Sequence, residues 1–302
     1  MPLVYHTIDV FTNRRLAGNP LAVVLDADGL SLPEMQSIAR DFNLSETVFV
    51  LKAVSPGHTA RIRIFTPSRE VPFAGHPTLG TAALLAELRS PSVHGESDAI
   101  IALEEQAGSV RVGVRLRTGA AAYGEFDAPN VPHEPAELTV PEEVAAAVGL
   151  MQTELGFENH KPTMLNASVT FAFVPVANLD AMAKLKISPV HWAHAFQDRG
   201  IDGAYVYTRQ CVRTHASFHA RMFAPELGIP EDPATGSAAI GFARIIHTFD
   251  ALPDGTHKRT VEQGLEIGRP SAIQLLISVA RGKLEGVRIG GHIVRVAQGT
   301  LL

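Results

Sequence analysis

Two stretches of the 302-residue chain are similar to each other, and this internal repeat constrains the fold more than any other feature. The residues RIFTPSREVPFAGHPTLGTAALLAEL, beginning at Arg63, align with RMFAPELGIPEDPATGSAAIGFARII, beginning at Arg221. Each stretch has the pattern of a strand, then a turn, then a helix of small and apolar residues. A helix that is apolar all round is buried on every side, for instance inside a curved sheet. The repeat therefore predicts two similar halves related by a pseudo-twofold axis.

Proline marks the expected start of both helices, because its fixed φ and missing N–H suit the first helical position. The residue before each proline then occupies the N-cap position, where Asp232 is a strong cap and His76 a poor one. A poor cap at a matched position suggests that His76 has another role. The alignment pairs His76-Pro77 with Asp232-Pro233, and residues 80–83 with residues 236–239.

The two predicted helix N-termini are candidates for an anion site. Each offers unpaired backbone N–H groups and the positive end of a helix dipole, and two halves that face each other direct both ends into one cleft. Thr81 and Ser237 add hydroxyl donors, and the glycines allow the backbone to approach a carboxylate. A phosphate is the alternative ligand, but the sequence has no G-x-x-x-x-G-K-[ST] or G-x-G-x-x-G motif, so nucleotide binding is weakly supported.

Strand patterns outnumber helix patterns along the chain, which indicates an α+β fold rather than a doubly wound parallel sheet. A shift toward Pro, Glu and Ala follows residue 122 and resembles a linker. We therefore expect one half over residues 1–122 and the other over residues 123–302, with the active site in the cleft between them. The last strand of the chain is a candidate to complete the first half.

Charge and composition exclude several classes of partner. The formal net charge is −5, and Lys and Arg are scattered, so neither nucleic acid nor an anionic membrane is an expected partner. A small molecule is expected instead. The N-terminus lacks a signal-peptide pattern, and no apolar run reaches the ~18 residues of a membrane span, so we expect a cytoplasmic protein. Cys211 is the only cysteine and is expected to be a buried small hydrophobe rather than a nucleophile.

Three ionisable residues are candidates for chemistry. Glu46 comes where a helix ends and a strand begins, and a carboxyl group half-buried there would have a raised pKa and could transfer a proton at neutral pH. Each candidate also has a plainer interpretation. Glu46 alone would be a solvated charge, His76 a structural histidine, and Asp232 an N-cap, although a cap and a functional role can coexist.

Two pairs of histidines have the separation of metal ligands. They are His191 with His194, and His215 with His219. Neither pair is accompanied by the glutamate and third ligand of a zinc hydrolase motif, so no metal is expected. The sequence also lacks a G-x-S-x-G motif, which leaves serine hydrolysis unsupported.

Several motifs together resemble the PhzF family of phenazine-biosynthesis-like proteins. They are GNPLAVV, NLSETVFV, FTPSREVPFAGHPTLGTA and DPATGSAA, and they occur in the family's order over nearly the whole chain. The resemblance implies a fold similar to diaminopimelate epimerase. In that fold two halves each wrap a curved, mainly antiparallel sheet around a central helix. It also implies a homodimer and an isomerase that needs no cofactor, with trans-2,3-dihydro-3-hydroxyanthranilate as the characterised substrate.

The resemblance also assigns roles to residues. It makes Glu46 the group that takes a proton from one carbon and returns it to another, with His76 and Asp232 assisting. Substrate-binding roles fall to Gly75, Gly236 and Ser237. The fold relatives that epimerise amino acids use two cysteines, which this chain lacks, so a two-thiol mechanism is excluded. Two alternatives stay open, namely another epimerase or lyase on the same scaffold and a non-enzymatic binder of small carboxylates.

Overall fold

The computed structural model describes residues 2–90, 95–166 and 169–302. The α-helices are α1 (Leu32–Phe42), α2 (Gly75–Arg89), α3 (Pro141–Val148), α4 (Leu179–Lys184), α5 (Pro189–Ala195) and α6 (Gly236–Asp250). Short 3₁₀ turns lie at Ala27–Gly29, Gln152–Glu154, Gln197–Arg199 and Pro225–Leu227. The strands are β1 (Leu3–Val10), β2 (Asn19–Val24), β3 (Glu46–Leu51), β4 (Ala60–Phe65), β5 (Glu70–Val71), β6 (Glu96–Glu105), β7 (Gly108–Arg117), β8 (Ala122–Asp127), β9 (Ala136–Glu137), β10 (Thr163–Asn166), β11 (Thr170–Pro175), β12 (Gly203–Thr208), β13 (Phe218–Ala224), β14 (Ile229–Asp232), β15 (Gly255–Gln263), β16 (Ser271–Ala280) and β17 (Lys283–Leu301).

Seven strands from the first part of the chain and the last strand, β17, form a closed ring. Their pairing runs β1–β2–β3–β4–β6–β7–β8–β17 and returns to β1. Helix α2 contacts seven of these strands, and its residues from Gly75 to Leu84 are all buried. Small and apolar side chains on every face make this position favourable, because no side of the helix has to face water.

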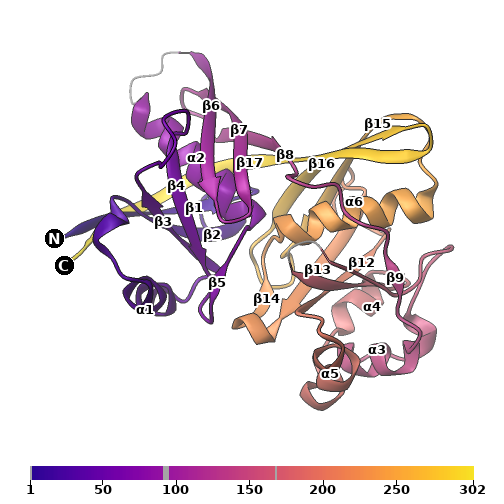
Figure 1. Cartoon of the computed structure of the whole chain (residues 1–302). Helices are drawn as coiled ribbons and strands as arrows, with labels where there is room; N and C mark the ends of the chain where they lie inside the picture. Colours follow the sequence, from indigo (N-terminus) through magenta and orange to yellow (C-terminus); the bar gives the residue numbers. More distant parts are fainter. Residues whose placement is uncertain (1, 91–94, 167–168) are drawn as a thin grey trace.

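The second part of the chain continues the same sheet. Strands β9, β10, β11, β12, β13, β15, β16 and β17 pair in that order. Helix α6 contacts β11, β16 and β17 and also meets α2. Figure 1 shows β17, in yellow, running across the molecule between the two groups of elements. The fold is thus a mixed α/β fold with one large, mainly antiparallel sheet.

The apolar interior has three parts. The largest surrounds α2 and α6 and includes Leu79, Ala83, Phe173 and Phe242. A second core lies beneath α3, α4 and α5, and a third lies between α1 and the outer faces of β2, β3 and β4. The sheet is therefore covered on its outer face where α1 and α3–α5 pack, as Figure 1 shows.

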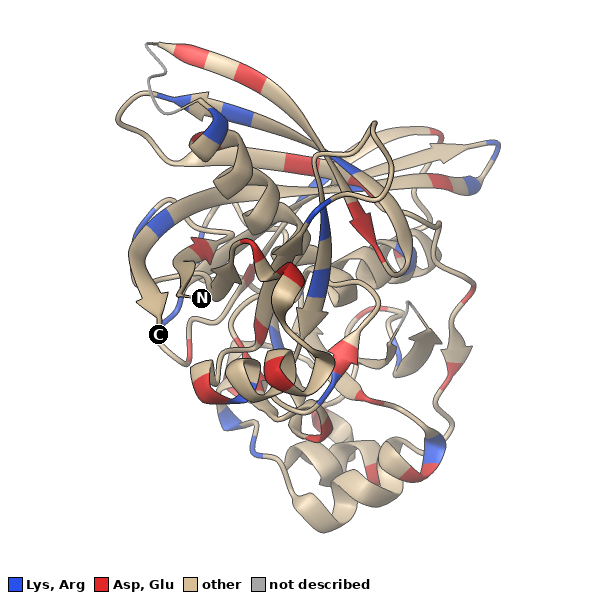
Figure 2. Cartoon of the chain, turned by 60° about the vertical axis from the view of Figure 1, so that its left-hand side comes forward, with Lys and Arg blue, Asp and Glu red and all other residues tan. Residues whose placement is uncertain are grey.

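Charged residues of both signs are interspersed over the chain. Figure 2 shows Lys and Arg alternating with Asp and Glu along the ribbon, which agrees with the mixed charge pattern of the sequence. Within the described ranges, none of the helices is long and apolar enough to cross a membrane.

The predicted helix starts at Pro77 and Pro233 are wrong. Helix α2 begins at Gly75 with Ala74 as its N-cap, and α6 begins at Gly236 with Thr235 as its N-cap. His76 therefore lies inside the first turn of α2, and Asp232 lies at the end of β14 rather than at a helix cap. By contrast, α1 begins directly after its N-cap residue Ser31, whose backbone N–H donates to Glu34.

The predicted alignment of the two repeats is wrong in its second part for the same reason. Arg63 forms a double hydrogen bond with Glu70, and Arg221 forms the same bond with Glu231, so these acids correspond. Gly75 then corresponds to Gly236, and His76 corresponds to Ser237 rather than to Asp232. The second repeat contains an additional 3₁₀ turn at Pro225–Leu227, which lengthens its loop. An alignment that matches the prolines does not account for this added length.

Candidate active site

Glu46 and His76 face each other where α2 begins. Glu46 is the first residue of β3, and the distance between its Oε2 and Nε2 of His76 is 3.5 Å. That separation is too long for a strong hydrogen bond, and neither atom has a hydrogen-bond partner among the described residues. The side chain of Glu46 is 14% exposed and that of His76 only 3%. Two buried polar atoms are thus left free to bind a ligand.

Asp232 lies beside this pair and is held by three side chains. Its Oδ1 accepts hydrogen bonds from Ser45 Oγ at 2.7 Å and from Asn19 Nδ2 at 2.9 Å. Its Oδ2 accepts from Thr235 Oγ1 at 2.5 Å. Ser45 directly precedes Glu46, so one short segment of chain presents both carboxyl groups to the same region. The orientation of Asp232 is therefore fixed before any substrate binds.

Asn19 joins Asp232 to His76, and sequence reasoning gave it no role. Its amide nitrogen donates to Asp232 and, at 2.8 Å, to the carbonyl of Ala234, which uses both amide protons. The same nitrogen lies 3.3 Å from Nδ1 of His76. Because an N–H at Nδ1 would point at these amide protons, the favoured tautomer carries its proton on Nε2, toward Glu46. The available signal in the sequence was an asparagine that directly follows a glycine at the start of a strand. In the structure Gly18 has a φ of +65°.

Burial shifts the pKa of all three ionisable groups away from the value that each has in water. Burial, assisted by the negative charge of Asp232, raises the pKa of Glu46 well above its usual value. Burial also raises the pKa of Asp232 to about 6, although Thr235, Ser45 and Asn19 oppose the shift. The pKa of His76 falls to about 3 for the same reason, so its imidazole stays neutral. The two carboxyl groups titrate as a pair, and at least one holds a proton near neutral pH more readily than in water.

The N-termini of α2 and α6 meet at two glycines. A Cβ atom added to Gly75 would lie 2.9 Å from Cα of Gly236, and one added to Gly236 would lie 2.9 Å from Cα of Gly75. No side chain larger than hydrogen fits between the two backbones without movement. The first N–H groups of both helices, including that of Ser237, therefore face the same small region and favour a negative charge there.

A hollow of about 370 Å³ adjoins this region. Phe73 and Ile240 form part of its apolar wall, and Ser237 lies in its lining. The segment from Ala128 to His133 and Asn166 of β10 also line it. Ser237 is the link between this hollow and the site, since Glu46, His76 and Asp232 do not line it.

Gln263, at the end of β15, is a second buried residue that sequence reasoning missed. Its Nε2 donates to the backbone carbonyl of Asp232 at 2.8 Å and to Thr235 Oγ1 at 3.1 Å. Its Oε1 accepts from the N–H of Thr235 at 3.2 Å. The side chain thereby holds the turn between β14 and α6. A glutamine at a strand end gives no pattern by which this role could be predicted.

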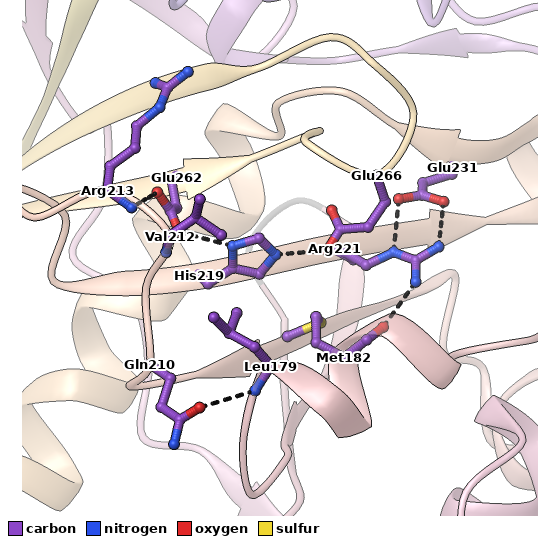
Figure 3. Close-up of polar contacts among 10 residues, drawn as sticks. All are labelled: Leu179, Met182, Gln210, Val212, Arg213, His219, Arg221, Glu231, Glu262 and Glu266. Carbon is purple, nitrogen blue, oxygen red and sulfur yellow. Dashed lines mark hydrogen bonds and ion pairs between the residues drawn. The ribbon is translucent and has the colours of Figure 1, made fainter.

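Two of the histidines with metal-like spacing are paired with carboxylates. His219 is buried between two carboxylates, with Nδ1 at 2.9 Å from Glu262 and Nε2 at 2.7 Å from Glu266, as Figure 3 shows. These two acids overcome burial and raise the pKa of His219 to about 9, so it is a structural cation. His194 of α5 pairs with exposed Asp198. Cys211 is half-buried, and burial raises the pKa of its thiol to about 11, which disfavours the nucleophilic thiolate.

One group with metal-like geometry occurs among the described residues, away from the predicted pairs. Glu158, His160 and Asp250 each have a ligand atom within 4.8 Å of the others. The guanidinium of Arg209 donates to Asp250 at 2.7 Å and to Glu158 at 2.9 Å, so a cationic side chain already balances these acids. This arrangement is that of an ion-pair network.

Comparison with known proteins agrees with this fold. The family model for phenazine biosynthesis-like proteins (PhzC-PhzF) matches residues 8–299. An uncharacterized isomerase of Mesorhizobium japonicum is 50% identical over 98% of each chain. The trans-2,3-dihydro-3-hydroxyanthranilate isomerase of Pseudomonas chlororaphis is 35% identical over 99% of each chain. A crystal structure of a PhzF-family protein from Bacillus anthracis has a TM-score of 0.87 and 27% identity, covering 100% of this chain and 99% of its own.

The fold and these relatives define the protein as an isomerase. More particularly, the chain belongs to the PhzC-PhzF family of phenazine biosynthesis-like proteins.

Proposed function

We propose that the protein moves a proton between two carbons of a small carboxylate-bearing substrate, with Glu46 as the acid and base. The observation that carries this proposal is the unpartnered pair of Glu46 Oε2 and His76 Nε2, which lie 3.5 Å apart beside the buried Asp232. A carboxyl group whose pKa is raised by burial is a stronger base than one in water, as removal of a proton from carbon requires.

The neighbouring groups support this chemistry in different ways. Neutral His76 presents an N–H toward Glu46 and the reacting part of a substrate, where it can stabilise developing negative charge. Asp232 keeps Asn19 and Ser45 in place and raises the pKa of Glu46. The helix ends at Gly75 and Gly236, with Ser237, favour the substrate carboxylate. General acid–base groups of this kind contribute roughly 10² to 10⁴ in rate.

The first substrate to test is trans-2,3-dihydro-3-hydroxyanthranilate or a compound like it. The Pseudomonas chlororaphis relative carries that substrate in its name and is 35% identical over 99% of this chain. The 370 Å³ hollow beside Ser237 is compatible with a single ring that carries one carboxylate. No cofactor is expected in this proposal.

The test is proton exchange observed by NMR in D₂O. Wild type and Glu46→Gln are incubated with that compound and with a panel of cyclic and acyclic amino and hydroxy acids. We expect deuterium to enter the substrate or product of the wild-type enzyme, and the rate to fall by roughly 10² or more in Glu46→Gln. Glu285→Gln, at an exposed position of β17, is the matched control and should keep the wild-type rate. An undiminished rate in Glu46→Gln would refute the role of Glu46.

Two other functions are distinguished by the same experiment. A lyase or epimerase at this site gives a different product from the same exchanging proton, which product analysis identifies. A non-enzymatic binder gives tight carboxylate binding without deuterium incorporation across the panel. The pairing of a carboxyl group with raised pKa and an unpartnered imidazole N–H favours an enzyme, since binding an anion requires no base.

The proposal also covers domain organisation and assembly. We propose two epimerase-like halves, residues 1–122 and 123–302, each with its central helix and with the active site between them. The matched Arg63–Glu70 and Arg221–Glu231 pairs and the meeting of α2 with α6 support this division. A homodimer and a cytoplasmic location complete the proposal, and light scattering of the purified protein tests the first of these.

A further inference from the structure

The corner between β6 and β7 packs against the start of α2. The backbone N–H of Ala107, in this corner, donates to the carbonyl of Pro72 at 3.1 Å. Glu105, the last residue of β6, points the other way into the protein and is only 9% exposed. Its Oε1 lies 2.7 Å from the hydroxyl of Thr78, which belongs to the first turn of α2 and is fully buried. None of the proposed chemistry uses this acid.

The hydroxyl of Thr78 has two possible acceptors within hydrogen-bond distance but only one proton to donate. The hydroxyl Oγ1 lies 2.8 Å from the carbonyl of Ala74 and 2.7 Å from Glu105 Oε1. If the hydroxyl donates to Ala74, the contact with Glu105 is a hydrogen bond only if Glu105 supplies the proton. If the hydroxyl donates to Glu105 instead, an ionised carboxylate is buried with one hydrogen bond and with Oε2 unpartnered. The first arrangement satisfies every proton and avoids an unpaired buried charge.

Among the described residues, no arginine, lysine or histidine forms a hydrogen bond or ion pair with Glu105 that would offset its ionised form. The charged side chains that line the hollow of about 310 Å³ beside it are Arg61 and Arg63 of β4, Glu70 of β5 and Glu104 of β6. Arg63 is engaged by Glu70 in two 2.7 Å hydrogen bonds, and Arg61 makes no hydrogen bond to Glu105. Burial raises the pKa of Glu105 to about 8, and the hydrogen bond to Thr78 lowers it only in part.

The second repeat has a neutral amide at the equivalent position. Glu104 accepts hydrogen bonds from the N–H groups of Val54 and Ser55, and Glu262 accepts them from Val212 and Arg213, as Figure 3 shows for the latter. The next residue is Glu105 in the first case and Gln263 in the second. Gln263 holds the start of α6 through Thr235, as Glu105 holds the start of α2 through Thr78. An uncharged side chain of the same shape, that of Gln263, therefore already holds the start of one helix in this molecule.

We propose that Glu105 is a positioning residue. It is a protonated, uncharged carboxylic acid at neutral pH that fixes the first turn of α2, and with it His76 and Gly75, by donating a hydrogen bond to Thr78. Its ionisation in alkaline solution releases this bond and loosens the turn. The inference concerns the shape of the site and holds whichever substrate the site takes.

Infrared difference spectroscopy tests the proton directly. The C=O stretch of a protonated carboxylic acid is separate from the bands of a carboxylate, so wild type minus Glu105→Gln at neutral pH should show an acid band. That band should be lost as the pH rises through about 8. A difference spectrum with carboxylate bands alone at neutral pH would overturn the proposal. This measurement uses no substrate, so its failure is separate from a failure of the proposed isomerase.

Hydrogen exchange at the start of α2 tests the positioning role. Glu105→Gln keeps a donor for Thr78 and should retain the wild-type exchange of the first-turn amides. Thr78→Val and Glu105→Ala remove the bond and should exchange several-fold faster there, with no change at the start of α6. In wild type, exchange at this turn, corrected for its intrinsic pH dependence, should accelerate above about pH 8, whereas in Glu105→Gln it should not. Equal exchange in all four proteins would overturn the role.

Thermal unfolding provides an independent check with a defined sign. Folded Glu105 keeps its proton up to about pH 8, whereas the unfolded chain releases it near the ordinary value of 4.5. The unfolded state thus binds fewer protons between these limits, and wild-type stability falls as pH rises. The Tm of Glu105→Gln minus the Tm of wild type should therefore increase from pH 4.5 to about 8 and then stay constant. A difference in Tm that does not change with pH would contradict a protonated Glu105.

Discussion

At the scale of single residues, the site combines polar atoms that have hydrogen-bond partners with polar atoms that have none. Both oxygens of Asp232 and both amide protons of Asn19 are engaged with each other or with nearby groups and form a fixed frame, in which Asn19 Oδ1 has no partner. Glu46 Oε2 and His76 Nε2 are left without partners inside that frame. Because an unsatisfied buried polar atom costs stability, its retention at this place is typical of a binding or catalytic site.

The interaction between the two carboxyl groups gives a prediction about pH. If Glu46 acts as the base, the rate of deuterium incorporation falls as pH drops through its raised pKa. Asp232→Asn removes a negative charge that raises this pKa, so the acid side of the pH profile should move to lower pH. Proton exchange measured from acid to neutral pH in both proteins checks the direction. An acid side that stays in place, or moves to higher pH, would show that the charge of Asp232 does not act on Glu46.

The contact between the helix ends gives a prediction about stability. Gly75→Ala places a methyl group 2.9 Å from Cα of Gly236, so the two helices must separate. We expect a loss of roughly 1–3 kcal/mol in the free energy of unfolding, together with loss of activity. Gly57→Ala is the control, since no atom lies within 4 Å of the added carbon there. Urea unfolding of both variants measures the difference, and equal stabilities would contradict the close approach.

At the scale of secondary-structure elements, each helix that reaches the site is braced by an Arg–Glu pair on the preceding strands. Arg63 pairs with Glu70 ahead of α2, and Arg221 pairs with Glu231 ahead of α6. The second pair is more buried, with side chains 10% and 12% exposed against 27% and 22% in the first. Arg221 also donates to the carbonyl of Met182 in α4, which ties the covering helices to this strand.

These two pairs allow a matched comparison. Glu231→Gln leaves the more buried guanidinium of Arg221 without its counter-charge and should cost about 3 kcal/mol of folding stability. Glu70→Gln makes the same change at the more exposed pair and should cost about 1 kcal/mol or less. Denaturant titration of the two single variants gives both values. A larger loss in Glu70→Gln would contradict the assignment of burial as the cause.

Elements also show what the sequence could predict and where prediction failed. The buried helices and the strand before each were accessible, because apolar composition and the internal repeat determine them. The grouping of Glu46 with His76 and Asp232 came from the resemblance to the PhzF family. The helix starts were not accessible, since Pro77 and Pro233 are signals that a turn can satisfy as well as a helix. Asn19, Gln263 and Glu105 were missed because their roles depend on burial and partners distant in sequence.

At the scale of the whole molecule, β17 connects the two parts of the sheet. Its residues Lys283–Gly290 pair with β16, and its residues Ile293–Leu301 pair with β1, with one irregularity in register in each pairing. The same strand pairs with β8 on its other edge between Arg288 and Ile293. The ring around α2 is therefore closed by the last residues of the described chain.

Truncation tests this dependence. Removal of residues 293–302 exposes the edge of β1 and opens the ring around α2, so we expect a poorly soluble protein that binds hydrophobic dyes. Removal of Leu302 alone, which lies outside β17, is the control and should leave solubility and the unfolding transition unchanged. A truncated protein with a sharp, wild-type-like transition would show that the ring does not need its final strand.

The position of β17 has a consequence for the order of events during synthesis. The other seven strands of the ring are made well before β17, so the interior around α2 stays incomplete until β17 has been synthesised. The pairing of β1 with β17 joins Leu3 to Leu301, and contacts between residues so far apart in sequence form late. The two helix ends, and with them the paired groups of the site, therefore become rigid only once β17 is in place, which keeps shorter nascent chains from displaying a finished active site.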